Sequence, residues 1–125
     1  MILVRTSLRP SPVHGLGCFT EEAIAKGQRV WVYDDRIDCR IAADDLPDLP
    51  PSIREFLDVY GYAEVYEGRK VIVLCGDLSK HMNHSADPNL TNDGPDNIAA
   101  RDIQPGEELT CDYYSFDLDA ASKFS

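Results

Sequence analysis

Short apolar runs, separated by polar connections that contain glycine or proline, are the main pattern along this chain. The runs are rich in Val, Ile, Tyr and Trp, which favour strands. They predict strands at residues 1–4, 18–20, 28–33, 62–66, 70–74, 98–101 and 108–114. The runs at 62–66 and 70–74 flank Glu67-Gly68-Arg69 and predict a hairpin. A loop is predicted for 44–51, which is rich in proline and aspartate, and a short helical turn for 77–82. The pattern indicates a mainly β domain with short strands and an irregular topology.

One segment has the periodicity of a helix. Its apolar residues recur at a spacing that puts them on one face. They are Ile53, Phe56, Leu57 and Tyr60. Ser52 is suited to cap this helix, with Glu55 completing a capping box, and Gly61 is suited to end it. We therefore expect one short helix between the β segments.

The composition is that of an ordinary globular domain. The chain has 125 residues, of which 43% are hydrophobic and 27% charged, and its apolar runs stay well below the roughly 20 residues that span a bilayer. No membrane span is therefore predicted. The net charge of −10 argues against direct binding of nucleic acid. The same charge suits a basic partner, and it equally suits simple solubility.

Four cysteines are scattered along the chain, at positions 18, 39, 75 and 111. No two form a CxxC pair and no histidine stands at ligand spacing, so no metal site is predicted. Each is expected to be a small buried thiol. Single thiols of this kind suit a reducing compartment, so we expect an intracellular protein. The expected location is the cytoplasm, with the nucleus or nucleoid as the alternative.

Three polar clusters do not fit a packing pattern. The first is Gly15-Leu16-Gly17, whose glycines allow the backbone to approach a ligand closely. The second is Asn83-His84-Ser85, where the asparagine offers both a donor and an acceptor. The third is the segment 106–113, which follows a turn at Gln104-Pro105-Gly106. Each cluster alone fits a structural role, but together they predict a ligand site.

In order and spacing these clusters resemble the motifs of the SET-domain lysine methyltransferases. Residues 14–19 and 24–28 resemble the start of that domain. Residues 80–89 resemble the family's Arg-Phe-Ile-Asn-His-Ser-Cys-x-Pro-Asn motif, and residues 103–113 resemble Ile-x-x-Gly-Glu-Glu-Leu-Thr-Tyr-Asp-Tyr. The resemblance covers residues 14 to 114. It implies a single SET domain over residues 1–125, with an N-terminal part at about 1–42, an insert at about 43–70, a C-terminal part at about 71–115 and a tail at 116–125.

The resemblance also implies roles for particular residues. S-adenosylmethionine would be bound by Gly15, Leu16, Gly17, Asn83, His84 and Tyr113. Tyr33 and Tyr113 would be catalytic and would line a narrow channel for the substrate lysine, which enters from the opposite face. The segments around Asn83 and Tyr113 would be threaded together in the knot-like arrangement of the family.

Three departures from the family motifs stand out. Ala86 replaces the Cys of the first motif and no Cys-rich tail follows, so the zinc-bearing module of many relatives is not expected. Lys80 and His81 replace Arg-Phe. Cys111 occupies the position at which relatives carry Phe or Tyr to limit the number of methyl groups added. A smaller side chain leaves more room beside the amine, which predicts multiple methylation.

The resemblance leaves the closure of the channel and the partners open. Tyr114, Phe116 and Phe124 are candidates to cover the channel, as is a second subunit in a homodimer, and a frayed tail is the alternative. The expected substrate is a basic, lysine-containing protein segment, with histones as one case. The alternative function is a non-catalytic binding or interaction module with the same fold. An unrelated β-rich domain would require the motif order to be accidental.

Overall fold

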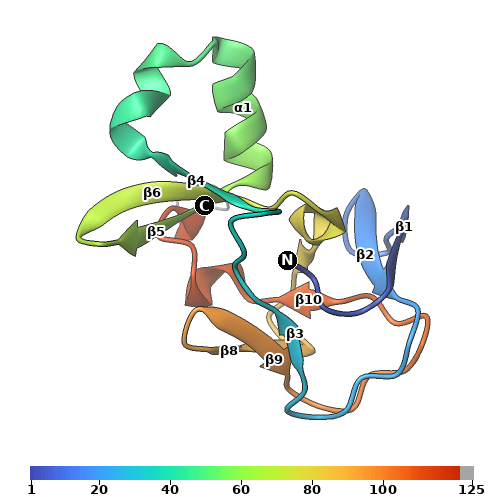
Figure 1. Ribbon diagram of the computed structural model, residues 1–125. Helices are drawn as coiled ribbons and strands as arrows, with labels where there is room; N and C mark the ends of the chain where they lie inside the picture. Colours follow the sequence, from blue (N-terminus) through green and yellow to red (C-terminus); the bar gives the residue numbers. More distant parts are fainter. Residues whose placement is uncertain (122–125) are drawn as a thin grey trace.

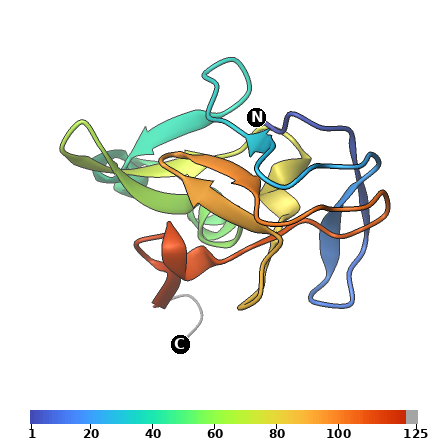
Figure 2. The ribbon, with the colours of Figure 1, turned by 90° about the horizontal axis from the view of Figure 1, so that it is seen from below.

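Four small sheets make up the protein, seen in a computed structural model that describes residues 1–121 (Figures 1 and 2). The strands are β1 (Thr6–Pro10), β2 (Leu16–Thr20), β3 (Arg29–Trp31), β4 (Cys39–Ala42), β5 (Tyr62–Tyr66), β6 (Arg69–Leu74), β7 (Asn83–His84), β8 (Leu90–Asp93), β9 (Asp96–Ala99) and β10 (Thr110–Cys111). The helical elements are the 3₁₀ helices η1 (Ala43–Asp48), η2 (Leu78–His81) and η3 (Tyr113–Ser115), and the α-helix α1 (Pro51–Tyr60). The predicted fold class, mainly β with short sheets and a short inserted helix, is confirmed.

Three of the sheets are antiparallel and one is parallel. Strands β1 and β2 form a hairpin, the order β4-β6-β5 forms a second sheet and β3-β9-β8 a third. The fourth sheet pairs β7 with β10 in parallel. The predicted hairpin around Glu67-Gly68-Arg69 is present as β5–β6, and positive φ angles at Glu67 and Gly68 provide its tight turn. The parallel pair joins two segments that lie far apart in the sequence.

The helix α1 begins two residues earlier than a cap at Ser52 predicts. Pro50 precedes it and Pro51 is its first residue, where proline is favoured because no N–H partner is needed. Ser52 therefore lies inside the first turn, and the predicted capping box is wrong because no side chain caps this end. Gly61 ends the helix as predicted. Of the predicted apolar face, Leu57 is buried, whereas Ile53 stays exposed.

Two hydrophobic clusters hold the fold together. The large cluster contains Val4, Cys18, Ile24, Val30, Met82, Leu90, Ala99, Ile103, Leu109 and Cys111. The small cluster contains Leu57, Ala63 and Ile72, with Ile41, Leu46, Leu49, Phe56 and Leu74 packed against them. In Figure 1, η1 and α1 stand on the sheet of β4, β5 and β6, apart from β8, β9 and β10. The small cluster thus belongs to the stretch from Ile41 to Leu74 and the large one to the rest of the domain.

Several strand predictions need correction. Strands β1, β4, β7 and β8 were missed. Strand β7 has only two residues, and the other three lack the alternation of buried and exposed residues that marks a half-buried strand. Residues 1–4 form no strand, although Ile2 makes an isolated bridge to Trp31. The proline- and aspartate-rich segment 44–51, predicted as a loop, contains most of η1 and the first residue of α1. Proline is compatible with these short or initial helical turns.

Three of the four cysteines are buried as predicted, but Cys39 is exposed. Cys39 lies at the start of β4, which pairs only with β6 and so forms the edge of its sheet. Within residues 1–121, no helix has both the length and the apolar character needed to cross a bilayer.

Candidate functional site

The parallel pair of β7 and β10 brings the second and third polar clusters together. Asn83 lies opposite Thr110, and His84 lies opposite Cys111. The segment just before β10 also runs beside β2, because the Leu109 N–H donates to the Cys18 carbonyl at 2.8 Å. The two segments that the sequence predicted to be threaded together therefore lie side by side, next to the strand that follows the glycine cluster.

Asn83 connects these segments to the glycine cluster. Its Nδ2 donates to the carbonyls of His14, at 3.0 Å, and Leu16, at 3.2 Å. It also donates to Oε2 of Glu108 at 2.8 Å. The side chain is buried, so its amide nitrogen is held on the loop that precedes β2.

His84 fixes the backbone at the other end of β10. Its Nδ1 accepts a hydrogen bond from the Tyr113 N–H at 3.0 Å. The imidazole ring also contacts the rings of Tyr113 and Tyr114, with centroid distances of 5.3 and 5.4 Å. Through this hydrogen bond and these ring contacts, His84 orders the start of η3.

A first cavity, of about 870 Å³, lies between the glycine cluster and the end of α1. Its lining includes these predicted cofactor residues: Gly15, Leu16, Asn83, His84 and Tyr113. Its opposite wall consists of Asp58, Val59 and Tyr60, together with Lys80 and His81. Gly17 does not line this cavity; it is buried behind the loop, beside Glu108. The structure thus brings five of the six predicted cofactor residues to one cavity.

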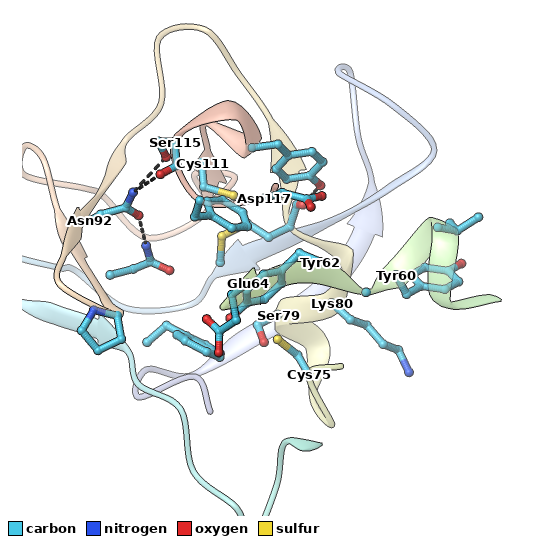
Figure 3. Close-up of a pocket in the computed structure, with 18 of the residues that line it drawn as sticks. Tyr60, Tyr62, Glu64, Cys75, Ser79, Lys80, Asn92, Cys111, Ser115 and Asp117 are labelled. Atoms are coloured by element: carbon cyan, nitrogen blue, oxygen red, sulfur yellow. Dashed lines mark hydrogen bonds between the residues drawn. The ribbon is translucent and has the colours of Figure 1, made fainter. Parts of the chain in front are cut away.

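A second cavity, of about 290 Å³, is shown in Figure 3 and shares Val59, Tyr60, Lys80 and Tyr113 with the first. Its aromatic lining consists of Trp31, Tyr60, Tyr62, Tyr113 and Phe116. Cys75 and Cys111 also line it, and burial raises the pKa of the Cys75 thiol to about 12. Figure 3 shows Cys111 and Asp117 on one side and Glu64, Cys75 and Ser79 on the other. Apart from Tyr113, Cys111 and Phe116, these residues were not predicted as part of a site, because they come from many separate elements.

Tyr113 forms part of the wall between the two cavities, since it lines both. Its hydroxyl donates to the Met82 carbonyl. Burial, reinforced by the neighbouring Cys111, raises the pKa of this phenol above its ordinary value. Tyr113 is therefore a neutral phenol whose proton is directed to the backbone, and its oxygen can accept a hydrogen bond from a ligand.

Tyr33 is not brought to either cavity, so the prediction that it shares a channel with Tyr113 is not met. The Arg40 guanidinium stacks on its ring, 3.5 Å from the centroid, and its hydroxyl donates to the Asp38 carbonyl at 3.4 Å. Burial and a hydrogen bond with Asp35 raise its pKa to about 12. The predicted strand 28–33 ends at Trp31, so Tyr33 lies beyond the sheet that would have set its direction. Its role in catalysis stays a prediction.

The residues proposed to cover the channel have different positions. Phe116 lines the second cavity, whereas Tyr114 is largely exposed and packs beside His84. Phe124 lies outside the described residues. Within residues 1–121, no group of three His, Cys, Asp or Glu side chains is arranged to hold a metal ion.

The parallel β7–β10 pair, the glycine cluster fastened to Asn83, and two cavities that share Tyr113 are together typical of SET domains. The sequence agrees, because residues 15–114 match the family model described as the SET domain. This chain therefore belongs to the SET-domain family, which includes protein-lysine methyltransferases. No curated protein matches it in sequence.

Solved structures with the same fold include histone methyltransferases and their complexes. One is a structure of the Chaetomium thermophilum Polycomb Repressive Complex 2 bound to GSK126. The matching chain has 25% sequence identity to this one and a TM-score of 0.72. That match covers 96% of this chain but only 17% of the other. A Plasmodium falciparum protein, described as a candidate histone methyltransferase, is 20% identical with a TM-score of 0.61, and the match covers 90% of this chain and 95% of that one. The second likeness shows the shared fold alone.

Proposed function

We propose that this protein transfers methyl groups from S-adenosylmethionine to the side-chain amine of lysine in a protein substrate. The observation that supports the proposal most directly is that Tyr113 lines both cavities. A cofactor in the first cavity and a lysine in the second would meet at this residue. Family membership supports the same reaction type.

The first cavity fits the proposed cofactor. Its volume lies within the range of about 300–1,000 Å³ that is usual for small-molecule sites. Gly15 has a positive φ of 46° and no side chain, so the backbone of the loop is open to a ligand. Asn83, whose amide nitrogen is held by the loop, offers its carbonyl oxygen to the amino group of the ligand. The bound cofactor would supply an electrophilic methyl group on a sulfonium.

The second cavity suits a lysine side chain. Its aromatic and thiol lining is apolar enough to strip water from the amine, and burial lowers the pKa of a lysine. The amine can therefore lose its proton without a strong protein base. Because the Tyr113 hydroxyl proton is directed to Met82, the phenol oxygen would accept an N–H of the amine and orient its lone pair. Alignment of this kind supplies much of the acceleration of an in-line displacement.

The charge of the protein supports a basic substrate. With a net charge of −10, the protein attracts a basic segment over long range. Histones are one class of protein with these properties. An intracellular location follows from this proposal, whereas a homodimer is not needed for it.

Tyr113→Phe tests the proposal. Removal of the hydroxyl should slow methyl transfer by at least about 100-fold, because the amine loses its orienting acceptor. Binding of S-adenosylmethionine, measured by calorimetry, should stay within a few-fold. Tyr66→Phe is a matched control, because this exposed tyrosine lines neither cavity. Transfer by Tyr113→Phe at the normal rate in a radiolabelled methyl assay would refute the role.

Cys111 is proposed to permit multiple methylation. Its small side chain lines the second cavity and leaves space beside the amine. Cys111→Phe should fill this space and shift the product towards monomethyl-lysine, which mass spectrometry of the substrate would show. Only monomethyl product from the unaltered protein would contradict the proposal.

The alternative is a binding module that keeps the fold without turnover. The same assays separate the two, because the module would bind S-adenosylmethionine or a basic peptide without labelling any lysine. The hydrogen bond from Tyr113 to Met82 and the cavity on each side favour the enzyme.

A further inference from the structure

Glu108 lies at the point where three distant segments meet. Its carboxylate accepts from Nδ2 of Asn83 at 2.8 Å. It also accepts from the Ser11 hydroxyl, with distances of 2.7 Å to Oε1 and 2.9 Å to Oε2. Ser11 and Glu108 are 97 positions apart in the sequence. The side chain itself does not line either cavity.

We propose that Glu108 is a positioning residue for the cofactor cavity, a role that rests on the proposed function. Through Ser11 it holds the start of the loop before β2, and through Asn83 it holds the asparagine that fastens the rest of that loop. Without this carboxylate, the Asn83 amide loses a fixed partner and the loop loses its connection to the segment before β10. The carbonyl oxygen of Asn83 then no longer points reliably to the cavity.

The neighbours of Glu108 require a group that only accepts. Asn83 presents an N–H, and Ser11 presents its O–H, since the Ser11 oxygen already accepts from the N–H groups of Val13, at 2.9 Å, and His14, at 3.3 Å. A carboxylate satisfies both donors with its two oxygens. A glutamine of the same shape would turn an NH₂ group towards one of them. The structure therefore distinguishes Glu from Gln at this position.

Gly17 is explained by the same carboxylate. A Cβ atom at Gly17 would lie 2.3 Å from Oε2 and 2.8 Å from Cδ of Glu108, and 3.1 Å from Cβ of Ser11. The space that a side chain would fill is thus occupied by the group that holds Asn83. Although Gly17 does not line the cavity, it would matter for the cofactor because any side chain there displaces the Glu108 carboxylate.

Glu108→Gln, compared with Glu107→Gln, is the first test. Glu107 is the adjacent carboxylate, but it pairs with Arg101 at 3.2 Å on the surface. Glu108→Gln should weaken the binding of S-adenosylmethionine by about tenfold or more, as expected for the loss of a hydrogen bond to a charged group. The KM for the peptide, and kcat at saturating cofactor, should change by less than about threefold, which a general loss of structure would not produce. Glu107→Gln should leave all three unchanged.

A readout without the cofactor separates this inference from the proposed function. The side-chain amide signal of Asn83, assigned in NMR spectra by its loss in Asn83→Asp, should shift in Glu108→Gln and not in Glu107→Gln. If the unaltered protein does not bind S-adenosylmethionine, the proposed function fails. The NMR signal still shows whether the Glu108 carboxylate holds the Asn83 amide. An unmoved Asn83 signal, or unchanged cofactor binding by Glu108→Gln in a protein that binds it, overturns the inference.

A double-mutant cycle tests the link to Gly17. Gly17→Ala should weaken cofactor binding by about tenfold in the unaltered protein, but by less than about threefold when Glu108→Ala has already emptied the contested space. Thermal unfolding of each variant shows whether it is folded. Equal effects of Gly17→Ala in the two backgrounds would show that Gly17 acts independently of Glu108, and would overturn the link.

Discussion

The two hydrophobic clusters are built in different ways. The small cluster and the residues packed on it come from one continuous stretch, from Ile41 to Leu74. The large cluster takes residues from Val4 to Cys111. The sequence motifs converge on the large cluster, which contains Met82, Leu109 and Cys111. Helix α1, which packs in the small cluster through Phe56 and Leu57, contributes to the site, because its residues Val59 and Tyr60 line both cavities. The comparison teaches that the site depends on long-range packing, while a locally built unit supplies one of its walls.

Leucine truncation in each cluster gives the largest expected difference. Leu109 is fully buried in the large cluster, so Leu109→Ala should cost about 3–5 kcal/mol of the free energy of unfolding. For a domain with a total stability of roughly 5–15 kcal/mol, that is a large fraction. Leu57→Ala in the small cluster should cost about 2–3 kcal/mol, because the surrounding residues are partly exposed and can relax. Urea denaturation measures both, and equal losses would contradict the difference between the clusters.

A buried asparagine should have the next largest effect. Asn89 is 2% exposed and connects the first motif to the second. Its Nδ2 donates to the Glu108 carbonyl at 2.8 Å, and its Oδ1 accepts from the Thr110 N–H at 2.9 Å. Asn89→Ala leaves two backbone groups unsatisfied and should cost roughly 2–4 kcal/mol.

The control for Asn89 is Asn97→Ala, which removes an exposed hydrogen bond to Asn92 at 3.0 Å. This variant should lie within about 0.5 kcal/mol of the unaltered protein in the same urea titration. A loss as large as that of Asn89→Ala would show that burial does not explain the difference.

Asp77, between β6 and η2 where the two regions join, gives the smallest effect. Burial alone would raise the pKa of Asp77, but hydrogen bonds from Ser79 and from the Ile2 N–H outweigh it, and the pKa is lowered. The folded protein therefore gains stability from the ionised carboxylate above the unfolded pKa of about 3.9, and loses it as the pH falls through the lower folded value. Asp77→Asn should cost about 1 kcal/mol at pH 7, since the site is partly exposed and screened.

The pH dependence makes the Asp77 effect testable. The difference between Asp77→Asn and the unaltered protein should shrink as the pH falls through the lowered pKa of the folded state, because the aspartate is then protonated in both states. Thermal unfolding across this pH range measures it. A difference that stays constant with pH would mean that the ionised form is not responsible.

The fold was predictable where the local sequence contains both a pattern of apolar residues and a residue that ends the element. The β5–β6 hairpin combines apolar runs with a turn at Gly68, and α1 combines periodicity with Gly61. Strand β1 has no such signal, because none of its residues is buried and its pairing with β2 decides its conformation. Local sequence does not contain that information.

The site was predictable only to the extent that its residues lie in motifs. Asn83, His84 and Tyr113 were found and lie at one cavity. Glu108 was inside a quoted motif but received no role, since its partners Ser11 and Asn83 meet it only in three dimensions. Tyr33 is the opposite case, because it was given a role but does not line either cavity. Strand β3 ends at Trp31, and the Tyr33 ring stacks with the Arg40 guanidinium instead.

The parallel pair of β7 and β10 also has a consequence for synthesis of the chain. A ribosome makes residues 41 to 74 well before Thr110, so the sheet of β4, β5 and β6 has all its strands while β7 still lacks its partner. Contacts between distant positions form slowly, and apolar surface that awaits its partner is prone to aggregation. Until residue 111 has been made, β7 has no partner and the large cluster lacks Leu109 and Cys111, so the interior around Met82 cannot be completed earlier.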